Sequence, residues 1–131
     1  KVDEMKLKDI HIVGFVEGKE KIYLFKQASI FVFLSEFEGM PNAVLEAMAF
    51  GLPVVTTNVG GIASVFSNGK NGYLIDDYDM IDLTTKIENL VNSIEMYNRI
   101  SSNNYKAAQS QFMASNVASR MLKIFDSVTY R

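Results

Sequence analysis

The sequence contains no cysteine and a single histidine, and these two shortages exclude several classes of function. Without cysteine the chain can form neither a disulfide framework nor a thiolate-bound metal site. One histidine cannot supply the several imidazole ligands of a zinc centre, so we expect no metal of that kind. The composition is compatible with a reducing compartment.

The chain also lacks an excess of positive charge and any long apolar run. Its 13 Lys and Arg residues face 15 Asp and Glu residues, for a formal net charge of −2, so we expect no nucleic-acid partner. Apolar runs such as residues 30–34 are far shorter than the roughly 20 residues that span a bilayer. We therefore expect no transmembrane segment, and residues 1–9 lack the apolar centre of a signal peptide.

The remaining composition is typical of a folded domain. Of the 131 residues, 48% are hydrophobic and 21% are charged, which argues against disorder. A chain of this length typically buries about 68% of its unfolded surface, enough for one core. We expect a single domain over residues 1–131.

Short apolar runs alternate with segments of helical spacing through the first 75 residues. The runs that predict strands are residues 10–16, 29–34, 53–56 and 73–75. The segments that predict helices are residues 19–28, 41–50 and 62–66. This alternation predicts an α/β fold, a Rossmann-like parallel sheet of about four strands with flanking helices.

The last third of the chain is predicted to be helical. Apolar residues recur with helical spacing over residues 83–94 and again over residues 117–128, which predicts two amphipathic helices. A shorter helix is expected between them over residues 99–111, with residues 101–104 (SSNN) as a polar break.

Two carboxylates, Glu38 and Glu46, lie where a predicted strand passes through a loop into a helix, with seven residues between them. In open parallel sheets ligands bind beyond the carboxyl ends of the strands, which is where this loop lies. Gly39 lets a ligand approach the backbone, and Pro41 suits a first helical turn, whose N–H groups lack partners. An anion such as a diphosphate fits there.

Asn42 and Glu46 are four residues apart and share a helix face, while Leu45 and Met48 point toward another. Glu46 can therefore face the cleft while the helix stays docked. Carboxylates would repel a diphosphate, so their expected partners are the hydroxyls of a sugar and a ribose. The pattern predicts a nucleotide-sugar site.

These residues resemble a known family. The resemblance is carried by residues 35–55 (SEFEGMPNAVLEAMAFGLPVV), Gly60-Gly61 and residues 71–75 (NGYLI). This set is similar to the C-terminal, donor-binding domain of the retaining glycosyltransferases of family 4, also called group 1. Enzymes of that family have the two-domain GT-B architecture. The resemblance is close over residues 13–75 and loose elsewhere.

The resemblance implies a role for each matching residue. Glu38 would bind donor-sugar hydroxyls near the reacting carbon, and Glu46 would hold the ribose. The other donor-binding residues would be Gly39, Met40, Pro41 and Asn42 at the sugar and diphosphate, Val16 and Lys21 at the nucleobase edge, and Gly60 and Gly61 in a second loop.

The resemblance also implies a reaction, the transfer of a hexose from a nucleoside diphosphate to an acceptor hydroxyl with retained configuration. The reaction would serve polysaccharide or glycoconjugate biosynthesis and would need no essential metal or other cofactor. The implied location of the parent enzyme is the cytoplasm or the cytoplasmic membrane face.

The chain also departs from the family pattern. The acidic residue that commonly follows the paired glycines is replaced by residues 62–64 (IAS), and the upstream segment with an Arg and a Lys that clamp the diphosphate does not precede the motif. The arginines are Arg99, Arg120 and Arg131, all in the predicted C-terminal helices. We therefore expect an incomplete donor domain. Its expected partner is the missing N-terminal acceptor domain of the parent enzyme, and we expect the chain alone to be inactive in sugar transfer.

Two expectations follow for the first and last elements. With its neighbours absent, the predicted strand at residues 10–15 would pair with residues 30–34 or with a second copy of the chain, because an unpaired edge favours self-association. The final helix would dock either on the acceptor domain or on this sheet.

Plainer interpretations stay open. Glu38 and Glu46 could be surface carboxylates at a helix start or a glycoside-hydrolase pair, although nothing builds a substrate groove. Gly60-Gly61 could be only a tight turn, and Lys21 part of a solvated face with Lys19 and Lys26. A structural role is favoured for His11, and core packing for the Met and Phe residues. The alternative function is a non-catalytic nucleotide-binding or scaffolding module.

Overall fold

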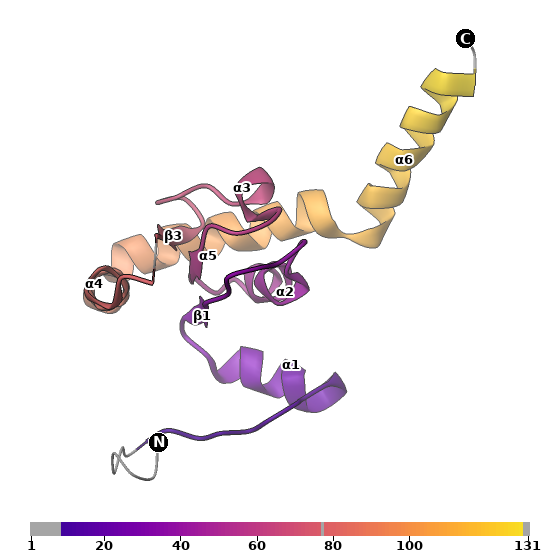
Figure 1. The fold of residues 1–131 in the computed structure, drawn as a ribbon. Helices are drawn as coiled ribbons and strands as arrows, with labels where there is room; N and C mark the ends of the chain where they lie inside the picture. The colour runs from indigo at the N-terminus through magenta and orange to yellow at the C-terminus, as the bar shows by residue number, and fades with distance from the viewer. Residues whose placement is uncertain (1–8, 77, 130–131) are drawn as a thin grey trace.

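The computed structural model describes residues 9–76 and 78–129. Its centre is a parallel sheet of three strands in the order β1 (Phe31–Phe33), β2 (Val54–Thr57) and β3 (Gly72–Ile75) (Figure 1). In the sheet register Phe31 lies opposite Val54, and Val54 lies opposite Gly72. The predicted α/β class and parallel sheet are confirmed.

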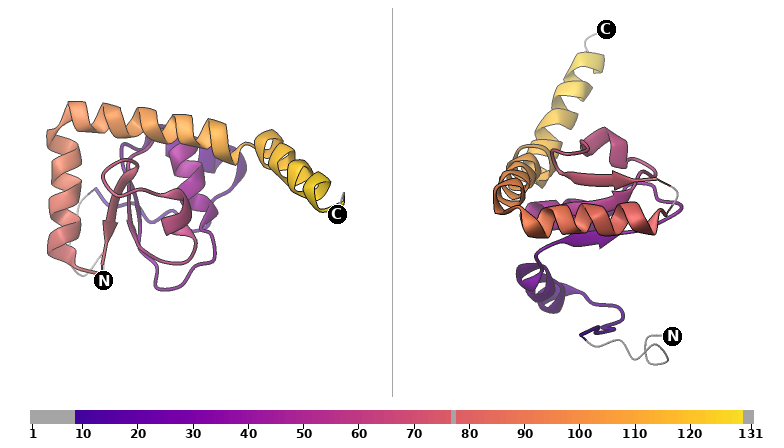
Figure 2. Two further views of the ribbon diagram at one scale, coloured as in Figure 1. Left: turned by 90° about the horizontal axis from the view of Figure 1, so that it is seen from above. Right: turned by 90° about the vertical axis from the view of Figure 1, so that its left-hand side faces the viewer.

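Helices flank this sheet and dominate the C-terminal part. Their bounds are α1 (Gly18–Gln27), α2 (Asn42–Ala49), α3 (Ile62–Val65), α4 (Met80–Asn92), α5 (Ile94–Ala107), the π-helical turn η1 (Ala108–Phe112) and α6 (Ala114–Thr129). Figure 2 shows α4 and α5 meeting at a corner beside the sheet, and α6 continuing beyond the end of α5. No helix among the described residues combines the length and apolar character needed to cross a membrane.

The central strand β2 builds the core on both faces of the sheet. All four of its residues are buried, and successive side chains of a strand point to opposite faces. Val54 packs in one cluster with Met48 and Ile62, and Val55 packs in a second cluster with Leu90. Because β2 is buried on both faces, the residues that lead to Thr56, Pro53 to Val55, are all apolar.

The expected strand over residues 10–16 does not form, so the sheet has three strands rather than about four. The segment is coil, with Ile12 80% and Phe15 88% exposed, and His11 is also exposed instead of holding a structural position in a strand. A strand needs a neighbour for its backbone N–H and C=O groups, and among the described residues none pairs with this segment. The pairing with residues 30–34 is therefore wrong.

The expected polar break at residues 101–104 is also wrong, because this run lies inside α5. The helix begins earlier than expected, at Ile94, where the Ser93 hydroxyl accepts a hydrogen bond from the Met96 amide. Asn104 is fully buried, and its Nδ2 donates to the backbone oxygens of Leu52 (2.7 Å) and Asn71 (2.8 Å). A polar residue that looks like a helix breaker thus attaches α5 to the sheet.

The last helix is amphipathic as expected but does not pack on the sheet. Figure 1 shows α6 projecting away from the sheet, and its residues Val117 and Met121 are 36% and 51% exposed. Val128, the last member of the predicted stripe, has a side chain outside the described part. Of the two expected docking surfaces for this helix, the sheet is excluded by this geometry.

Replacing Asn104 with Ala will lower the free energy of unfolding by about 2–4 kcal/mol, because the change leaves the buried carbonyls of Leu52 and Asn71 without their donor. The measurement is equilibrium unfolding in urea. Asn98, exposed on the same helix, is the control, and its replacement with Ala will change the free energy by less than about 0.5 kcal/mol. Equal effects of the two changes would contradict the assigned role of Asn104.

Candidate functional site

The loops that follow β1, β2 and β3 meet at one edge of the sheet, because all three strands are parallel. These loops are residues 34–41, residues 58–61 and the segment that begins at Asp76. The carboxyl edge of such a sheet is where open α/β folds bind ligands. The motif carboxylate Glu38 lies in the first of these loops.

The start of α2 is open to an anion. The helix begins at Asn42, and Pro41 holds the preceding position with extended backbone (φ −73°, ψ 102°) and no side-chain cap. The first amides of a helix have no partner within the helix, and the helix dipole is positive there. The N-terminus predicted to meet a diphosphate is therefore present, one residue later than the sequence indicated.

The loop that carries Glu38 is fastened at its base and open at its tip. The Thr57 hydroxyl donates to the Ser35 backbone oxygen at 2.7 Å and accepts from the Ser35 amide at 3.1 Å, which joins β2 to the start of the loop. The Ser35 hydroxyl lies 3.5 Å from Glu38 Oε1. Glu38 itself is exposed, so its carboxylate is accessible to hydroxyls of a ligand.

Gly60 and Gly61 lie directly against this loop. The Gly61 amide donates to the Gly39 backbone oxygen at 2.6 Å, and Gly60 has a left-handed backbone (φ +56°). A Cβ atom at Gly60 would lie 1.9 Å from the Glu38 oxygen and 2.4 Å from the Gly39 oxygen. The paired glycines therefore do more than form a turn, because a side chain at Gly60 would prevent this contact between the two loops.

Glu46 forms an ion pair with Lys21. The Lys21 Nζ and Glu46 Oε1 atoms are 2.8 Å apart, and the two side chains are 38% and 40% exposed. Two residues assigned to donor binding, separated by 25 positions, are thus brought together. Val16 is half-buried in the coil before α1, and its assignment to the nucleobase edge stays a prediction.

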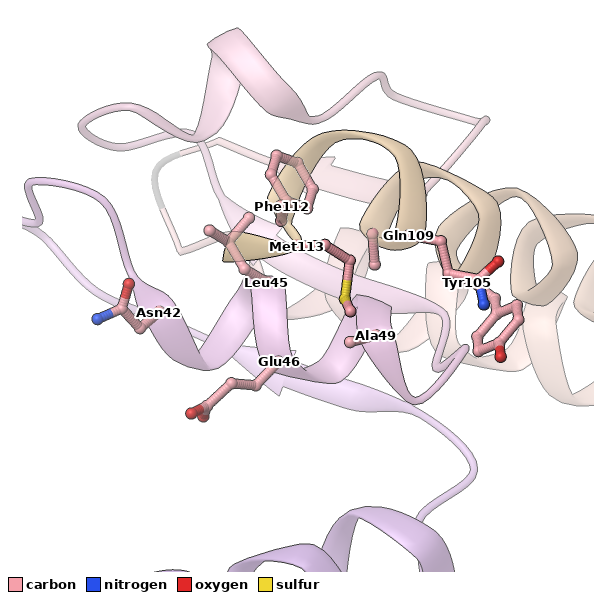
Figure 3. A pocket seen from close by; sticks show the side chains of 9 residues that line it. Asn42, Leu45, Glu46, Ala49, Tyr105, Gln109, Phe112 and Met113 are labelled. Atoms are coloured by element: carbon pink, nitrogen blue, oxygen red, sulfur yellow. The ribbon is translucent and has the colours of Figure 1, made fainter. Parts of the chain in front are cut away.

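A cavity of about 540 Å³ runs along the outer face of α2, as Figure 3 shows. Asn42, Leu45, Glu46 and Ala49 form one wall, so Asn42 and Glu46 share a face as expected, and Leu45 also reaches this face. The opposite wall comes from α5, η1 and the residue after it: Tyr105, Ala108, Gln109, Phe112 and Met113. Sequence reasoning missed this wall, because it depends on the packing of helices about 60 positions apart.

A second, smaller cavity of about 240 Å³ lies at the carboxyl edge itself. Its polar lining includes Glu36, Asn58, Asp76 and Tyr78. Partial desolvation, and then the negative charge of Glu36, raise the pKa of the Tyr78 phenol above its ordinary value of 10.0. The sequence did carry a signal for this cavity, because several of its residues come directly after the three strands.

Among the described residues, no group of three or more His, Cys, Asp or Glu side chains is arranged to hold a metal ion. The acidic side chains of this region lie apart along different elements, with Glu38 in a loop and Glu46 on α2. The site therefore offers a ligand backbone amides, hydroxyls, single carboxylates and the ammonium group of Lys21. Carboxylates and amides of this kind suit a ligand rich in hydroxyl groups.

Comparison with known proteins gives a consistent result at the level of sequence. Residues 2–107 match the family model described as glycosyl transferases group 1. The chain is 32% identical over 119 residues to spore coat protein SA of Bacillus subtilis (strain 168), covering 89% of this chain and 32% of that protein. It is 30% identical over 102 residues to the capsular polysaccharide biosynthesis glycosyltransferase CapM of Staphylococcus aureus, covering 78% of this chain and 27% of that protein. The chain thus spans about a third or less of the length of these relatives.

Solved structures agree on the fold. The C-terminal domain of a glycosyl transferase group 1 family protein (LpcC) from Francisella tularensis superposes with a TM-score of 0.75 at 24% identity, covering 86% of this chain and 59% of that one. Anabaena HepE in complex with UDP-glucose gives a TM-score of 0.83 at 21% identity, covering 96% of this chain and 35% of that one. The predicted fold, that of a GT-B C-terminal domain, is confirmed.

Replacing Gly60 with Ala will lower the free energy of unfolding by about 2–4 kcal/mol, because the added methyl group meets backbone oxygens and the backbone is left-handed. Gly69 is the matched control: its backbone is also left-handed (φ +76°), but a Cβ there meets nothing within 4 Å. Its replacement with Ala will cost about 1–2 kcal/mol. Urea unfolding measures both, and amide chemical shifts of Glu38 and Gly39 should move only in the Gly60 variant. Identical costs would show that the contact between the loops is not tight.

Proposed function

The chain belongs to the group 1 glycosyltransferases, and from this premise we propose that it binds a nucleoside-diphosphate sugar at the carboxyl edge of its sheet, for retaining transfer of a hexose to an acceptor hydroxyl. One observation carries the proposal. Glu38 and Glu46 lie on either side of a helix N-terminus that no side chain caps, next to a loop that Gly60 and Gly61 bring into backbone contact.

Each part of the ligand has a chemically suited partner. The diphosphate meets the first amides of α2, where a helix terminus contributes about 0.3–1 kcal/mol toward an anion. Glu38, exposed at the tip of its loop, accepts hydrogen bonds from donor-sugar hydroxyls. Glu46, at the half-buried face of α2, accepts from the ribose hydroxyls. This division keeps both carboxylates on hydroxyls and away from the phosphates.

Relatives and structural neighbours of the chain support this class of ligand and product. HepE of Anabaena is described in complex with UDP-glucose, and also with UDP and glucose. CapM of Staphylococcus aureus is named for capsular polysaccharide biosynthesis. We infer by analogy that this chain takes part in polysaccharide or glycoconjugate assembly, with amides and cations rather than a metal ion facing the diphosphate.

We further propose that this chain works as the donor half of a larger enzyme. Arg99 lies in α5 and Arg120 in α6, so neither comes from the loops of the site. Loss of one preorganised donor in an active site raises a barrier by about 2.7–4 kcal/mol, more than a helix N-terminus supplies. We assign the cations that would clamp the diphosphate, and the acceptor-binding surface, to parts of the parent enzyme beyond these residues. The exposed apolar residues of α6 suit contact with such a domain.

The chain will bind at least one of UDP, GDP and ADP, and replacing Glu46 with Gln will weaken that binding by about 10- to 100-fold. The reason is that charge-assisted hydrogen bonds to the ribose are worth about 1.5–3 kcal/mol. Saturation-transfer NMR will show reduced ribose signals in this variant, and titration gives the affinity. The Glu88→Gln variant, at an exposed position of α4, is the control. Unchanged ribose signals in Glu46→Gln would remove its assigned role.

The 131 residues alone will not catalyse transfer, although they bind the nucleotide. The assay incubates the chain with UDP-glucose, GDP-mannose and ADP-glucose and a panel of hydroxyl acceptors, and measures the nucleoside diphosphate released. A full-length group 1 glycosyltransferase serves as the positive control. Transfer above background by the isolated chain would refute the assignment of essential groups to the rest of the parent enzyme. A parent enzyme that binds nucleotide but never transfers sugar would favour the alternative, a non-catalytic binding module.

A further inference from the structure

We propose that Lys21 is a positioning residue for the donor ribose: through its ion pair it holds the Glu46 carboxylate in the orientation that ribose hydroxyls require. The inference rests on the proposed function, because it gives Glu46 the ribose as its ligand. It replaces the expectation that Lys21 itself lies at the nucleobase edge.

The geometry of the pair leaves room for a ligand. Lys21 Nζ approaches Glu46 Oε1 at 2.8 Å, and among the described residues the hydrogen bond of this carboxylate engages Oε1 and leaves Oε2 for a hydroxyl. The Glu46 side chain is 40% exposed and lines the cavity along α2, so a ligand can reach it. Figure 3 shows the Glu46 side chain extending from α2 away from Phe112 and Met113 of the opposite wall. The cation therefore fixes one oxygen without covering the other.

Lys21 lies on a helix, α1, that is attached to the core through one buried residue. Phe25, one turn after Lys21 on the same helix, is buried in the main core. Its ring stacks on Phe50, which follows α2, with ring centroids 5.2 Å apart and an interplanar angle of 16°. It also contacts Phe31 of β1 at 5.7 Å. The aromatic contact anchors α1 one turn from Lys21, and the ion pair then holds the carboxylate.

The pair is better explained by positioning than by stability. Ion pairs exposed to this degree contribute little to folding, because water screens the charges and two long side chains must be ordered. Orientation of a ligand-binding group before the ligand arrives, however, raises affinity by removing an ordering cost from the binding step.

The experiment compares a ribose with its analogue lacking both hydroxyls. UDP, GDP and ADP are each titrated against the chain beside the 2′,3′-dideoxy form, and the ratio of the two dissociation constants measures the ribose preference. Replacing Lys21 with Met will reduce this preference by about 3- to 10-fold and leave the affinity for the dideoxy form within about 2-fold. Lys21→Arg keeps a cation within reach and will restore most of the preference. Lys26→Met, at an exposed position of the same helix, is the matched control and will change neither affinity.

Other results would overturn the inference. An equal loss of affinity for both forms in Lys21→Met would make Lys21 a phosphate ligand, and a gain for the ribose form would make the pair a barrier that ligands must open. An unchanged preference would leave no role for Lys21. In the ligand-free protein, a nuclear Overhauser effect between the Lys21 ε-protons and the Glu46 γ-protons should be present and should persist after nucleotide addition. Its loss on binding would also contradict positioning.

The same assay separates this inference from the proposed function. If Glu46→Gln abolishes the ribose preference but Lys21→Met does not, only the role of Lys21 fails. If the wild-type chain shows no ribose preference, or binds none of the three nucleotides, the proposed role of Glu46 fails and this inference fails with it. Amide spectra and urea unfolding of each variant confirm that the fold is retained before affinities are compared.

Discussion

The backbone contact between the paired glycines and the carboxylate loop is the constraint on which the site depends. Gly61 donates to Gly39 at 2.6 Å, and Gly60 has no space for even a methyl group beside Glu38. This contact joins the loop after β1 to the loop after β2 at the carboxyl edge of the sheet. A site made of two loops keeps its shape only if the loops hold each other, since neither loop is a regular element with its own hydrogen-bond ladder.

One buried polar side chain attaches the helical third of the chain to the sheet. Asn104 Nδ2 donates to backbone oxygens of Leu52, before β2, and of Asn71, before β3, and Asn104 Oδ1 accepts from the side-chain Nδ2 of Asn71 at 2.8 Å. These bonds attach α5 at the amino edge of the sheet. The continuation of α5 into η1 then lies along α2 and forms the far wall of the larger cavity (Figure 3). A buried network of this kind specifies one docking position, because any displacement would leave polar groups unpaired.

The charges around the carboxylate motif are poorly suited to holding a diphosphate without further cations. The N-terminus of α2 favours an anion by a small amount, and the carboxylates beside it oppose one. Lys21 compensates Glu46 across a 2.8 Å ion pair, while Glu38 is left to hydroxyl partners. Under the proposed function, these charges favour the alcohol groups of a nucleotide sugar over its phosphates, in keeping with the proposal that other parts of a larger enzyme supply cations to the diphosphate.

The sequence by itself determined the parallel α/β class, the buried strand β2, the helix that carries Glu46, and the carboxylate motif, because each of these follows from residues close together in the chain. It did not determine that residues 10–16 would stay unpaired, that Asn104 would be buried inside a helix, or that Tyr105 and Phe112 would face α2. It also could not bring Lys21 to Glu46, which are 25 positions apart. Local spacing fixes periodicity and turns, whereas pairing, burial and ion contacts between distant segments depend on which surfaces meet when the helices dock on the sheet.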